Sequence, residues 1–528
     1  MVFASRFPEL SIPEQELSAY VLAGAGRHPD RPAVIDAVGG RRLTYGELAA
    51  QVDRVAAGLA GLGVGRGAVV AVMLPNGPEY PVAFLGIARS GAACTTLNPA
   101  YTSHEIRAQL ADAGARVVVT TPDGVDKARA ASGPDVRLVV LGGAASGEAI
   151  AFDELLRAAG PAPSVALDPA EDLAALPYSS GTTGLPKGVM LTHRNLVANA
   201  AQCGPFYTGG DDVVLAVAPF FHIMGMAVLL LGGLSRGATL VTMPRFDFAQ
   251  ALRAIEEHRV TCAVVAPPVM VALAKHPAVD AHDLSSVRLL TSGGAPLGAH
   301  VQEACAARLG CRTAQGWGMT ELAGAGSVSP PPDSARDVAG TVGWCVAGAE
   351  MKVVDPVGGE ELGVGERGEL WFRGPNVMRG YLHNAEATAA TLTQDGWCRT
   401  GDVACIDEDG SVAIVDRLKE LIKYKGYHVA PAELEAVLLS HPQVADAAVV
   451  ASPDEEAGEV PKAFLVLEDA GDPQDVAQEV MAYVAERVAP YKRVRRHEIV
   501  DAVPRTPSGK IVRRGLIERE RSAAQGAV

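Results

Sequence analysis

The hydrophobic pattern of the chain alternates between short apolar runs and longer stretches of helical periodicity. Runs rich in β-branched residues at 69–74, 115–121 and 238–243 have the length and composition of buried strands. Between such runs lie Ala-rich segments such as 44–63, in which apolar residues recur at the spacing of one helix face. Strands that alternate with helices in this way predict βαβ units and mostly parallel sheets.

The pattern changes after about Thr341. Short strand-like runs at 349–355, 368–374 and 410–417 lie between Gly and Asp turns, which is typical of a β-rich region. From about Leu418 onward, helical and strand-like segments mix again. This part of the chain therefore predicts a β-rich subdomain followed by a separate α+β unit.

The length of 528 residues corresponds to several folding units at about 150 residues each. We predict an α/β fold with two domains. The large N-terminal domain, residues 1–416, combines βαβ-type subdomains with the β-rich subdomain. The small C-terminal domain, residues 417–528, is α+β.

Charge and cysteine content narrow the function classes. The chain has 61 acidic and 46 basic residues, a net charge of -15, which excludes a nucleic acid as the main partner because that binding depends on Lys and Arg. Eight cysteines without a CxxC pair argue against a zinc knuckle and suit a reducing compartment. The N-terminus lacks a signal-peptide pattern, and the most apolar stretch, 220–243, is interrupted by His222 and Arg236. We expect a cytoplasmic protein without a membrane span.

The segment 179–193, SSGTTGLPKGVMLTH, is the densest chemical signal in the chain. Its glycines, hydroxyls and one lysine suit phosphate oxygens, because glycine lets the backbone approach closely and the side chains donate. It is not a Walker A loop, since Pro186 stands where that pattern has Gly before Lys. A flexible linker is the competing interpretation, and the predicted strand before the segment and helix after it disfavour that.

Two further segments could hold a nucleotide. In 315–321, QGWGMTE, glycines flank Trp317 and could expose its ring to a purine, while Glu321 could bind Mg²⁺. In 398–402, CRTGD, Asp402 could accept both hydroxyls of a ribose. Taken alone, a buried core Trp and an ordinary turn Asp explain these residues equally well or better.

Two segments of the C-terminal domain carry cations. The segment 504–514 places Lys510 in a Pro/Gly loop that could reach a neighbouring site, although a lone surface lysine is the simpler explanation. The segment 415–431 is either a binding surface or a solvated basic face. It brings together four basic residues: Arg417, Lys419, Lys423 and Lys425.

These segments are stronger evidence for a nucleotide site together than alone, because they occur in one chain and in a fixed order. On the motifs SSGTTGLPKGV, QGWGMTE, GELWFRG, RTGD, DRLKELIKYKGY and PRTPSGK, the chain resembles the acyl-adenylate-forming superfamily, and within it the 4-coumarate–CoA ligases and related acyl-CoA synthetases. The resemblance extends from 43–48 to 507–514. It implies an ATP-dependent carboxylate–CoA ligase that forms an acyl-AMP with release of pyrophosphate, and then a CoA thioester with release of AMP. ATP, Mg²⁺ and coenzyme A are the implied cofactors.

The resemblance also implies roles for individual residues around the nucleotide. The ATP phosphates would be held by Ser179, Ser180, Gly181, Thr182, Thr183 and Lys187. The adenylate would be bordered by Gly294, Gln315, Gly316, Trp317 and Thr320, with Trp317 stacking on adenine. Mg²⁺ would be bound by Glu321 and Thr183, the ribose hydroxyls by Asp402, and ribose or phosphate by Arg417.

The small domain is implied to be mobile. Lys510 would bridge the carboxylate and the α-phosphate during adenylation, and Lys419 falls on the hinge position. Lys423 would meet the adenylate in a second conformation. CoA would be met by Lys425, Gly426 and Arg245, and His222 would line the approach of acyl group and thiol.

The expected acyl pocket departs from the plant 4-coumarate–CoA ligases. Those enzymes carry Tyr where this chain has Met224, and Lys where it has Thr291. At the adenine position they usually carry Tyr, where this chain has Trp317. Cys398 and His428 are further exchanges, and neither removes a catalytic charge. The residues expected to line the pocket are small, apolar or uncharged: His222, Met224, Gly225, Val264, Thr291, Gly293 and Gly318. We therefore predict a monocarboxylic acid, either aromatic (cinnamate- or coumarate-like, or another aryl acid) or of medium chain length.

Alternatives remain at this point. An enzyme that loads the phosphopantetheine thiol of a carrier protein shares the first step, although Arg245 and the segment 425–426 favour free CoA. A non-catalytic nucleotide- or acyl-binding protein fits poorly, because Lys187 and Lys510 are both present. Luciferase-like oxygenation does not follow from the fold alone. The exact acid and the oligomeric state, a homodimer being one option, are not predicted.

Overall fold

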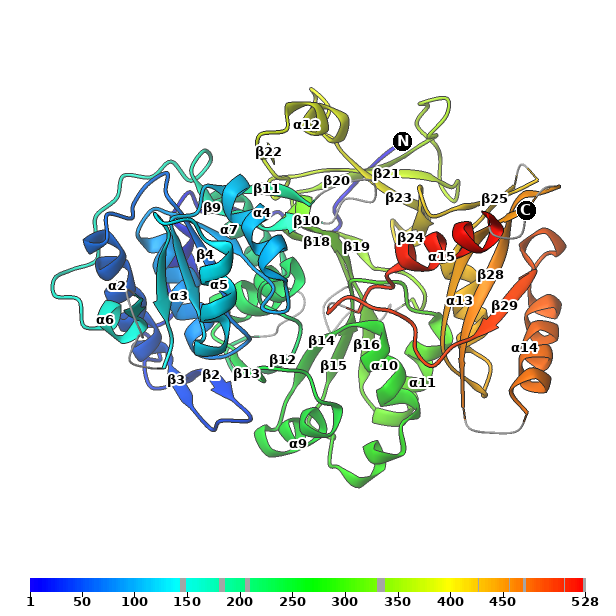
Figure 1. The fold of residues 1–528 in the computed structure, drawn as a ribbon, viewed down its shortest axis with the longest axis horizontal. Coiled ribbons are helices and arrows are strands. Elements are labelled where there is room, and N and C mark those ends of the chain that lie inside the picture. Colours follow the sequence, from blue (N-terminus) through cyan, green and yellow to red (C-terminus); the bar gives the residue numbers. More distant parts are fainter. Residues whose placement is uncertain are drawn as a thin grey trace.

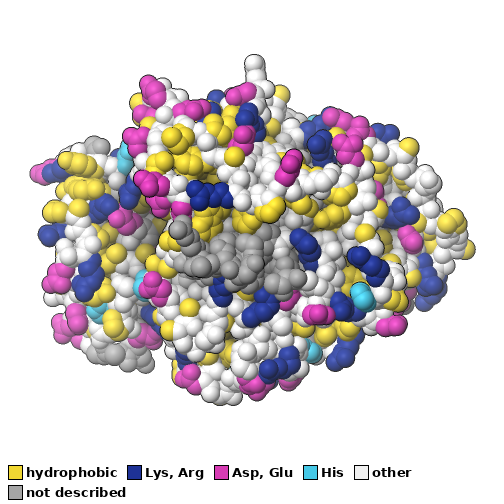
Figure 2. Space-filling model, turned by 180° about the vertical axis from the view of Figure 1, so that it is seen from behind, with side chains coloured by type: hydrophobic (Ala, Val, Ile, Leu, Met, Phe, Trp, Pro, Cys, Tyr) yellow, Lys and Arg dark blue, Asp and Glu magenta, His cyan; other side chains and the backbone are white. Residues whose placement is uncertain are grey.

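The computed structural model describes most of the chain. The described residues are 1–142, 149–179, 186–204, 209–329, 338–425, 427–454, 456–468, 472–507 and 509–525. A large lobe ends with a strand at Arg417, and a small lobe begins at Leu418 (Figure 1). Figure 2 shows the opposite face, on which acidic and basic side chains are interspersed.

Two mostly parallel sheets form the first part of the large lobe. The nine-stranded sheet runs in the order β10-β11-β9-β5-β4-β6-β7-β8, with β22 paired to β11. Its strands are β4 (Val69–Met73), β5 (Ala93–Thr96), β6 (Val117–Thr120), β7 (Arg137–Val140), β8 (Ile150–Ala151), β9 (Leu173–Ala175), β10 (Tyr178–Ser179), β11 (Lys187–Thr192) and β22 (Gly380–Tyr381).

The second sheet has seven strands in the order β16-β15-β14-β12-β13-β2-β3, and all its pairs are parallel except that of β2 with β3. The strands are β2 (Pro32–Asp36), β3 (Arg42–Thr44), β12 (Val213–Ala216), β13 (Thr239–Thr242), β14 (Cys262–Val265), β15 (Leu289–Ser292) and β16 (Arg312–Gln315). The predicted parallel architecture is confirmed, and three of the apolar runs that we singled out are the strands β4, β6 and β13.

Helices pack around these sheets and follow the predicted periodicity. The segment predicted at 44–63 is helix α2, which starts with a capping box between Thr44 and Glu47 and buries Leu48 and Val52. The helices are α1 (Leu17–Val21), α2 (Tyr45–Gly61), α3 (Glu79–Arg89), α4 (Ser103–Ala113), α5 (Val125–Ala131), α6 (Phe152–Leu156), α7 (His193–Gln202), α8 (Gly233–Ser235), α9 (Phe248–His258), α10 (Pro267–Lys275), α11 (Ala299–Leu309) and α12 (Ala385–Thr391), with short 3-10 turns η1 (Pro122–Gly124), η4 (Pro277–Ala281) and η5 (Thr320–Leu322).

The apolar stretch 220–243 folds as a buried helix and strand. Its helix is a π-helix, η3 (Met224–Gly232), in which every residue is buried, and the chain continues through α8 into β13. Within the described part of the chain, we find no helix with both the length and the apolar character needed to cross a bilayer.

The region predicted as β-rich contributes to two antiparallel sheets, which also include β1, β17 and β18 from earlier in the chain. One has the order β1-β20-β21-β23-β24 and the other β17-β18-β19. Their strands are β1 (Val2–Ala4), β20 (Glu350–Val354), β21 (Gly368–Arg373), β23 (Cys398–Ile406), β24 (Val412–Arg417), β17 (Trp317–Met319), β18 (Gly324–Val328) and β19 (Trp344–Cys345).

The small lobe has its own sheet and its own core. The sheet order is β26-β25-β28-β27, with β29 paired to β28. Its elements are β25 (Ile422–Tyr424), β26 (Tyr427–Val429), α13 (Pro431–Leu439), β27 (Val444–Asp454), β28 (Gly458–Leu467), α14 (Pro473–Arg487), η6 (Pro490–Lys492), β29 (Arg496–Ile499) and α15 (Arg513–Gln525). Ile422, Leu434 and Val480 belong to a hydrophobic cluster made only of small-lobe residues. The α/β fold with a large and a small unit is thus as expected from the sequence.

Candidate functional site

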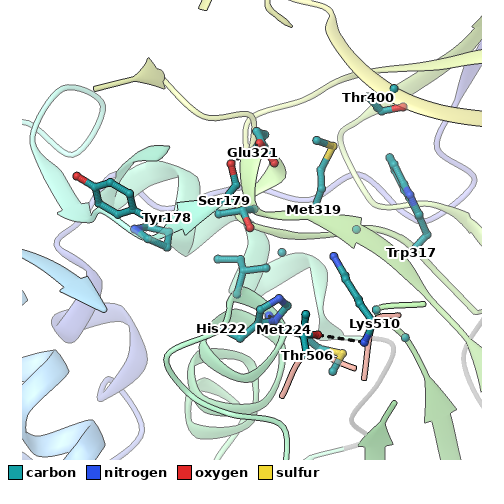
Figure 3. A pocket seen from close by; sticks show the side chains of 18 of the residues that line it. Tyr178, Ser179, His222, Met224, Trp317, Met319, Glu321, Thr400, Thr506 and Lys510 are labelled. Atoms are coloured by element: carbon teal, nitrogen blue, oxygen red, sulfur yellow. Dashed lines mark hydrogen bonds between the residues drawn. The ribbon is translucent and has the colours of Figure 1, made fainter. Parts of the chain in front are cut away.

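A cavity of about 660 Å³ lies where the two lobes meet. Its walls come from the ends of β10, β14 and β15, from Gly316 after β16, from the hairpin β17–β18, from β23 and β24, and from the small-lobe loop that contains Lys510. In Figure 1 this loop, drawn in red, reaches from the small lobe toward the centre of the molecule. Figure 3 shows Ser179 and Glu321 close together in the cavity, with Lys510 extending between His222 and Trp317.

A carboxylate is held next to the predicted phosphate segment. Ser179, at the end of β10, donates from its Oγ to Glu321 Oε1 at 3.0 Å. Tyr381, in β22, donates from its hydroxyl to the same oxygen at 2.7 Å. Burial and the charge of Glu321 raise the pKa of Tyr381, which keeps its phenol protonated as a donor. Lys187 Nζ lies 4.3 Å from the centre of the Tyr381 ring, so a cation faces the same corner.

The residues of this corner fit a magnesium ion bound together with substrate phosphates. Mg²⁺ is usually held by one or two carboxylates while phosphate oxygens and waters complete its shell. Glu321 lines the cavity, and its side-chain hydrogen bonds with described residues, from Ser179 and Tyr381, both fall on Oε1. No group of three or more His, Cys, Asp or Glu side chains suited to a metal occurs in the parts of the chain that are described. Thr183, the other predicted ligand, lies outside the described residues.

Asp402 and the residues around it form a second polar corner. Asp402 lies in β23 opposite Arg417 of β24, and Arg417 Nε contacts its Oδ1 at 3.0 Å. Trp317 Nε1 donates to Oδ2 at 2.8 Å. The charge of Asp402 raises the pKa of Arg417, so this guanidinium stays charged. Trp317 and Arg417 line the cavity, while Asp402, which contacts both, is buried behind them and does not line it.

Lys510 reaches the cavity on a tightly fastened loop. Arg505 pairs with Asp446 of the small lobe at 2.7 Å and donates to Gly509 O at 2.8 Å. Lys510 N donates to Thr506 Oγ1 at 3.1 Å, the bond drawn in Figure 3. Gly509 has a φ of +86°, and a Cβ there would lie 2.7 Å from Ala266 Cβ of the large lobe. Glycine is therefore required both by the backbone conformation and by the contact between the lobes.

The Lys510 ammonium lies among other charges. Burial and the nearby Arg417 lower its pKa below the ordinary value, while Asp402 and Glu321 act in the opposite direction. The same cation affects His222. Burial and the charge of Lys510 lower the pKa of His222 to about 3. His222 is therefore neutral near pH 7.

The opposite side of the cavity is apolar, and the backbone at its glycines leaves little room for a side chain. His222, Met224, Val264 and Gly293 line it, and a Cβ at Gly293 would lie 3.4 Å from Met224 Sδ. At Gly318 a Cβ would lie 1.9 Å from Gly324 O, so only glycine permits this strand pairing.

The structure brings most of the predicted site residues into this one cavity. Those that line it are Ser179, Lys187, His222, Met224, Val264, Gly293, Gly294, Gly316, Trp317, Gly318, Thr320, Glu321, Arg417, Lys419 and Lys510. Sequence reasoning missed Tyr381, Glu369, Val228, Gly324 and Ala325, which also line it. Tyr381 lies 60 residues from Glu321, and no local pattern pointed to that contact.

Other predicted residues lie away from the cavity wall. Thr291, Gly225 and Gln315 are buried behind it, and Gln315 bonds to Leu297 O and Gln302 instead. Arg245, Lys423 and Lys425 are exposed. Ser180, Gly181, Thr182, Thr183 and Gly426 lie outside the described residues. In this structure the Lys510 side of the small lobe faces the cavity, and Lys423 does not line it.

Comparisons with known proteins identify the family. A family profile described as AMP-binding enzyme matches residues 22–382, and one described as AMP-binding enzyme C-terminal domain matches residues 433–510. The chain belongs to the AMP-binding enzyme family. The family expected from the motifs is thereby confirmed.

Curated relatives and solved structures match this AMP-binding enzyme over nearly its whole length. It is 46% identical to 4-coumarate–CoA ligase 5 of Oryza sativa subsp. japonica, over 98% of this chain and 96% of that one. It is 41% identical to 4-coumarate–CoA ligase 2 of Petroselinum crispum, over 98% and 96%. The anthranilate CoA ligase AuaEII, solved with anthranoyl-AMP, has a TM-score of 0.90 at 28% identity over 98% and 99%. A benzoate CoA ligase from Burkholderia xenovorans LB400 has a TM-score of 0.85 at 30% identity over 95% and 100%.

Proposed function

We propose that this AMP-binding enzyme is an ATP-dependent carboxylate–CoA ligase that works through an acyl-adenylate. The observation that carries the proposal is the placement of Lys510 in the cavity that also contains Ser179, Glu321 and Trp317. The cation of Lys510 is thereby positioned between a phosphate-binding corner and an apolar pocket. The CoA ligases named above, among the relatives and the solved structures, support the same reaction class.

In the first step an oxygen of the substrate carboxylate bonds to the α-phosphorus of ATP. The bond from that phosphorus to the oxygen bridging to the β-phosphate breaks, and pyrophosphate leaves. This step brings two anions together, so cations must offset the charge that develops. Lys510 and Lys187 supply positive charge, and the Ser179 hydroxyl donates to Glu321 and so helps to hold that carboxylate in place. Mg²⁺ held by Glu321 would supply further charge neutralisation at the phosphates.

In the second step the sulfur of CoA bonds to the acyl carbon as the thiol loses its proton. The bond between that carbon and the adenylate oxygen breaks, and AMP leaves. Lys510 occupies the cavity in the present conformation, so the small lobe must move to admit the thiol. Lys423, Lys425 and Gly426 would then face the adenylate and CoA, with Lys419 near the hinge and Arg245 on the large lobe.

The apolar side of the cavity supports an aromatic monocarboxylic acid as the substrate. His222 is neutral there, and Met224, Val264 and Gly293 carry no charge that could pair with a second carboxylate or an ammonium group. Relatives and neighbours are named for 4-coumarate, anthranilate and benzoate. We therefore rank cinnamate-like and other aryl acids first, and medium-chain acids second.

A substrate panel tests this function. AMP release is measured with ATP and CoA over aryl, cinnamoyl, medium-chain, dicarboxylic and amino acids, and the reaction is repeated with a phosphopantetheinylated carrier protein as the thiol. We expect the highest kcat/KM for an aryl or cinnamoyl acid with free CoA. A strong preference for a dicarboxylate or an amino acid, or turnover with the carrier protein alone, would contradict the proposal.

We also propose a cytoplasmic location. All eight cysteines are free thiols, which suits a reducing compartment. Fractionation of the cells that produce the protein checks this, and recovery in an oxidising compartment would contradict it.

A further inference from the structure

The indole N–H of Trp317 donates a hydrogen bond to the carboxylate of Asp402. Trp317 Nε1 donates to Asp402 Oδ2 at 2.8 Å, and the bond is buried. Arg417 Nε contacts the other oxygen, Oδ1, at 3.0 Å. Each carboxylate oxygen is thus held from a different side, and the carboxylate cannot rotate without losing one of these partners.

The local backbone explains how the ring reaches this position. Trp317 pairs with Ser327 across the hairpin β17–β18, and Gly318 pairs with Ala325, so the register shifts by one residue between them. Gly326 is the extra residue of this bulge. A Cβ at Gly326 would lie 2.5 Å from Trp317 Cζ3 and 2.9 Å from its Cε3. The absence of that Cβ lets the ring lie against the strand, and bulges of this kind redirect side chains.

The carboxylate retains acceptor capacity after binding both partners. Two carboxylate oxygens offer about four acceptor positions in total. Trp317 and Arg417 occupy one on each oxygen. Asp402 does not itself line the cavity, but its partners Trp317 and Arg417 and the preceding residue Gly401 do, so the carboxylate lies directly behind the wall against which a nucleotide sugar would bind.

We propose that Trp317 is a positioning residue for sugar recognition: its N–H fixes the carboxylate of Asp402 so that the free acceptor positions receive the 2′ and 3′ hydroxyls of the ATP ribose. This inference rests on the proposed function, in which Asp402 binds the ribose. It adds a polar role to an aromatic side chain that would otherwise only stack on adenine. Phe and Tyr provide a ring at this position but no indole N–H.

The test compares nucleotides that differ only in the sugar. Pyrophosphate release with a fixed acid is measured with ATP, 2′-deoxy-ATP and 3′-deoxy-ATP, for the wild type, Trp317→Phe and Trp317→Tyr. Loss of a hydrogen bond to a charged group should reduce the preference for ATP over each deoxynucleotide by about tenfold in kcat/KM. Loss of stacking affects all three nucleotides equally and cancels in this ratio. An unchanged ratio in Trp317→Phe would overturn the proposal.

Two further variants make the result specific. Gly326→Ala leaves Trp317 in the chain but pushes its ring away from the strand, so it should reduce the same ratio, and an unchanged ratio counts against the proposal. Trp344→Phe is the matched control: it removes a partly buried indole N–H that donates to Asp409 O at 2.9 Å, away from the cavity. We expect Trp344→Phe to leave the ratio unchanged, and a drop equal to that of Trp317→Phe would overturn the assignment.

Asp402→Asn separates this inference from the proposed function. If Asp402→Asn loses the preference for ATP and Trp317→Phe retains it, Asp402 recognises the sugar without help from Trp317. If Asp402→Asn retains the preference, Asp402 does not bind the ribose, and the inference fails together with that part of the proposed function. Loss of the preference in both variants supports both statements.

Discussion

At the scale of single residues, the proposed reaction depends on charged side chains that surround one cavity. Lys510 lies near Arg417, Asp402 and Glu321. Burial and the charge of Arg417 lower the pKa of Lys510, while the charges of Asp402 and Glu321 act to raise it. Arg417 and Asp402 pair with one another. Lys510, by contrast, is directed into the space where the reacting carboxylate and phosphate would meet (Figure 3).

Lys510→Ala should therefore separate the two half-reactions. We expect adenylate formation, measured as pyrophosphate release, to fall by about 100-fold or more, because a preorganised cation at the reacting phosphate is lost. Thioester formation from supplied acyl-AMP and CoA should remain within about threefold of the wild type. Equal losses in both half-reactions would remove the assignment.

His222 gives a prediction for stability against pH. Its folded pKa, about 3, lies below the ordinary value of 6.5, so the unfolded chain binds a proton that the folded chain does not. The stability that this provides is present above pH 6.5 and is lost as the pH falls toward 3. His222→Gln should reduce the fall in melting temperature between pH 7 and pH 4 by about 2 °C or more.

The exposed His104 provides the control for that measurement. His104→Gln should leave the pH dependence of the melting temperature as it is in the wild type. If His222→Gln and His104→Gln behave alike, His222 is not held neutral by the fold.

The residues that the sequence predicted were those inside dense motifs. Ser179, Glu321 and Lys510 each lie in a run of residue types that suits phosphate or metal chemistry. Tyr381 and Gly324 also line the cavity but come from segments without such a pattern, and only the pairing of β11 with β22 and of β17 with β18 brings them there. Contacts between distant segments depend on the fold, so no local sequence pattern predicts them.

At the scale of elements, regular periodicity was predictable and local irregularity was not. The strands of the parallel sheets follow from β-branched runs. The π-helix η3 did not, because nine consecutive buried residues give no periodic pattern to distinguish one helix type from another. The bulge between β17 and β18 was equally hidden, although it places both Trp317 and Gly318.

Gly509 is the element-scale position with the sharpest consequence. Its positive φ shapes the loop, and its missing Cβ lets the loop contact Ala266 of the large lobe. Gly509→Ala should lower the rate of adenylation by about tenfold, from backbone strain and the clash together, and should affect thioester formation less.

Gly359→Ala is the control, since Gly359 has a φ of +79° in open space. It introduces backbone strain without a contact between lobes, and we expect both half-reaction rates to be unchanged. A uniform loss in Gly509→Ala would show that the loop matters only for folding.

At the scale of the whole molecule, two lobes with separate cores meet through the Gly509 loop and through polar contacts. Besides the Gly509 loop, Lys275 Nζ at the end of α10 donates to Leu439 O at 3.2 Å and to Val444 O at 3.3 Å. Asp416 Oδ2, at the end of β24, accepts from Ala432 N of α13 at 2.8 Å. A cation near the last carbonyls of α13 is favourable but exposed, so it stabilises this arrangement only modestly. Such an interface is compatible with motion of the small lobe.

A reversible cross-link between the lobes tests the central claim most directly. A Cβ built at Gly298 lies 3.3 Å from Ala436 Cβ, close to the 3.5–4.5 Å that disulfides span, so Gly298→Cys with Ala436→Cys should lock the present arrangement on oxidation. Each single substitution serves as the control. We predict that the oxidised double variant still forms acyl-AMP in a single turnover, produces no CoA thioester, and regains thioester formation on reduction. Full thioester synthesis by the cross-linked protein would contradict the account.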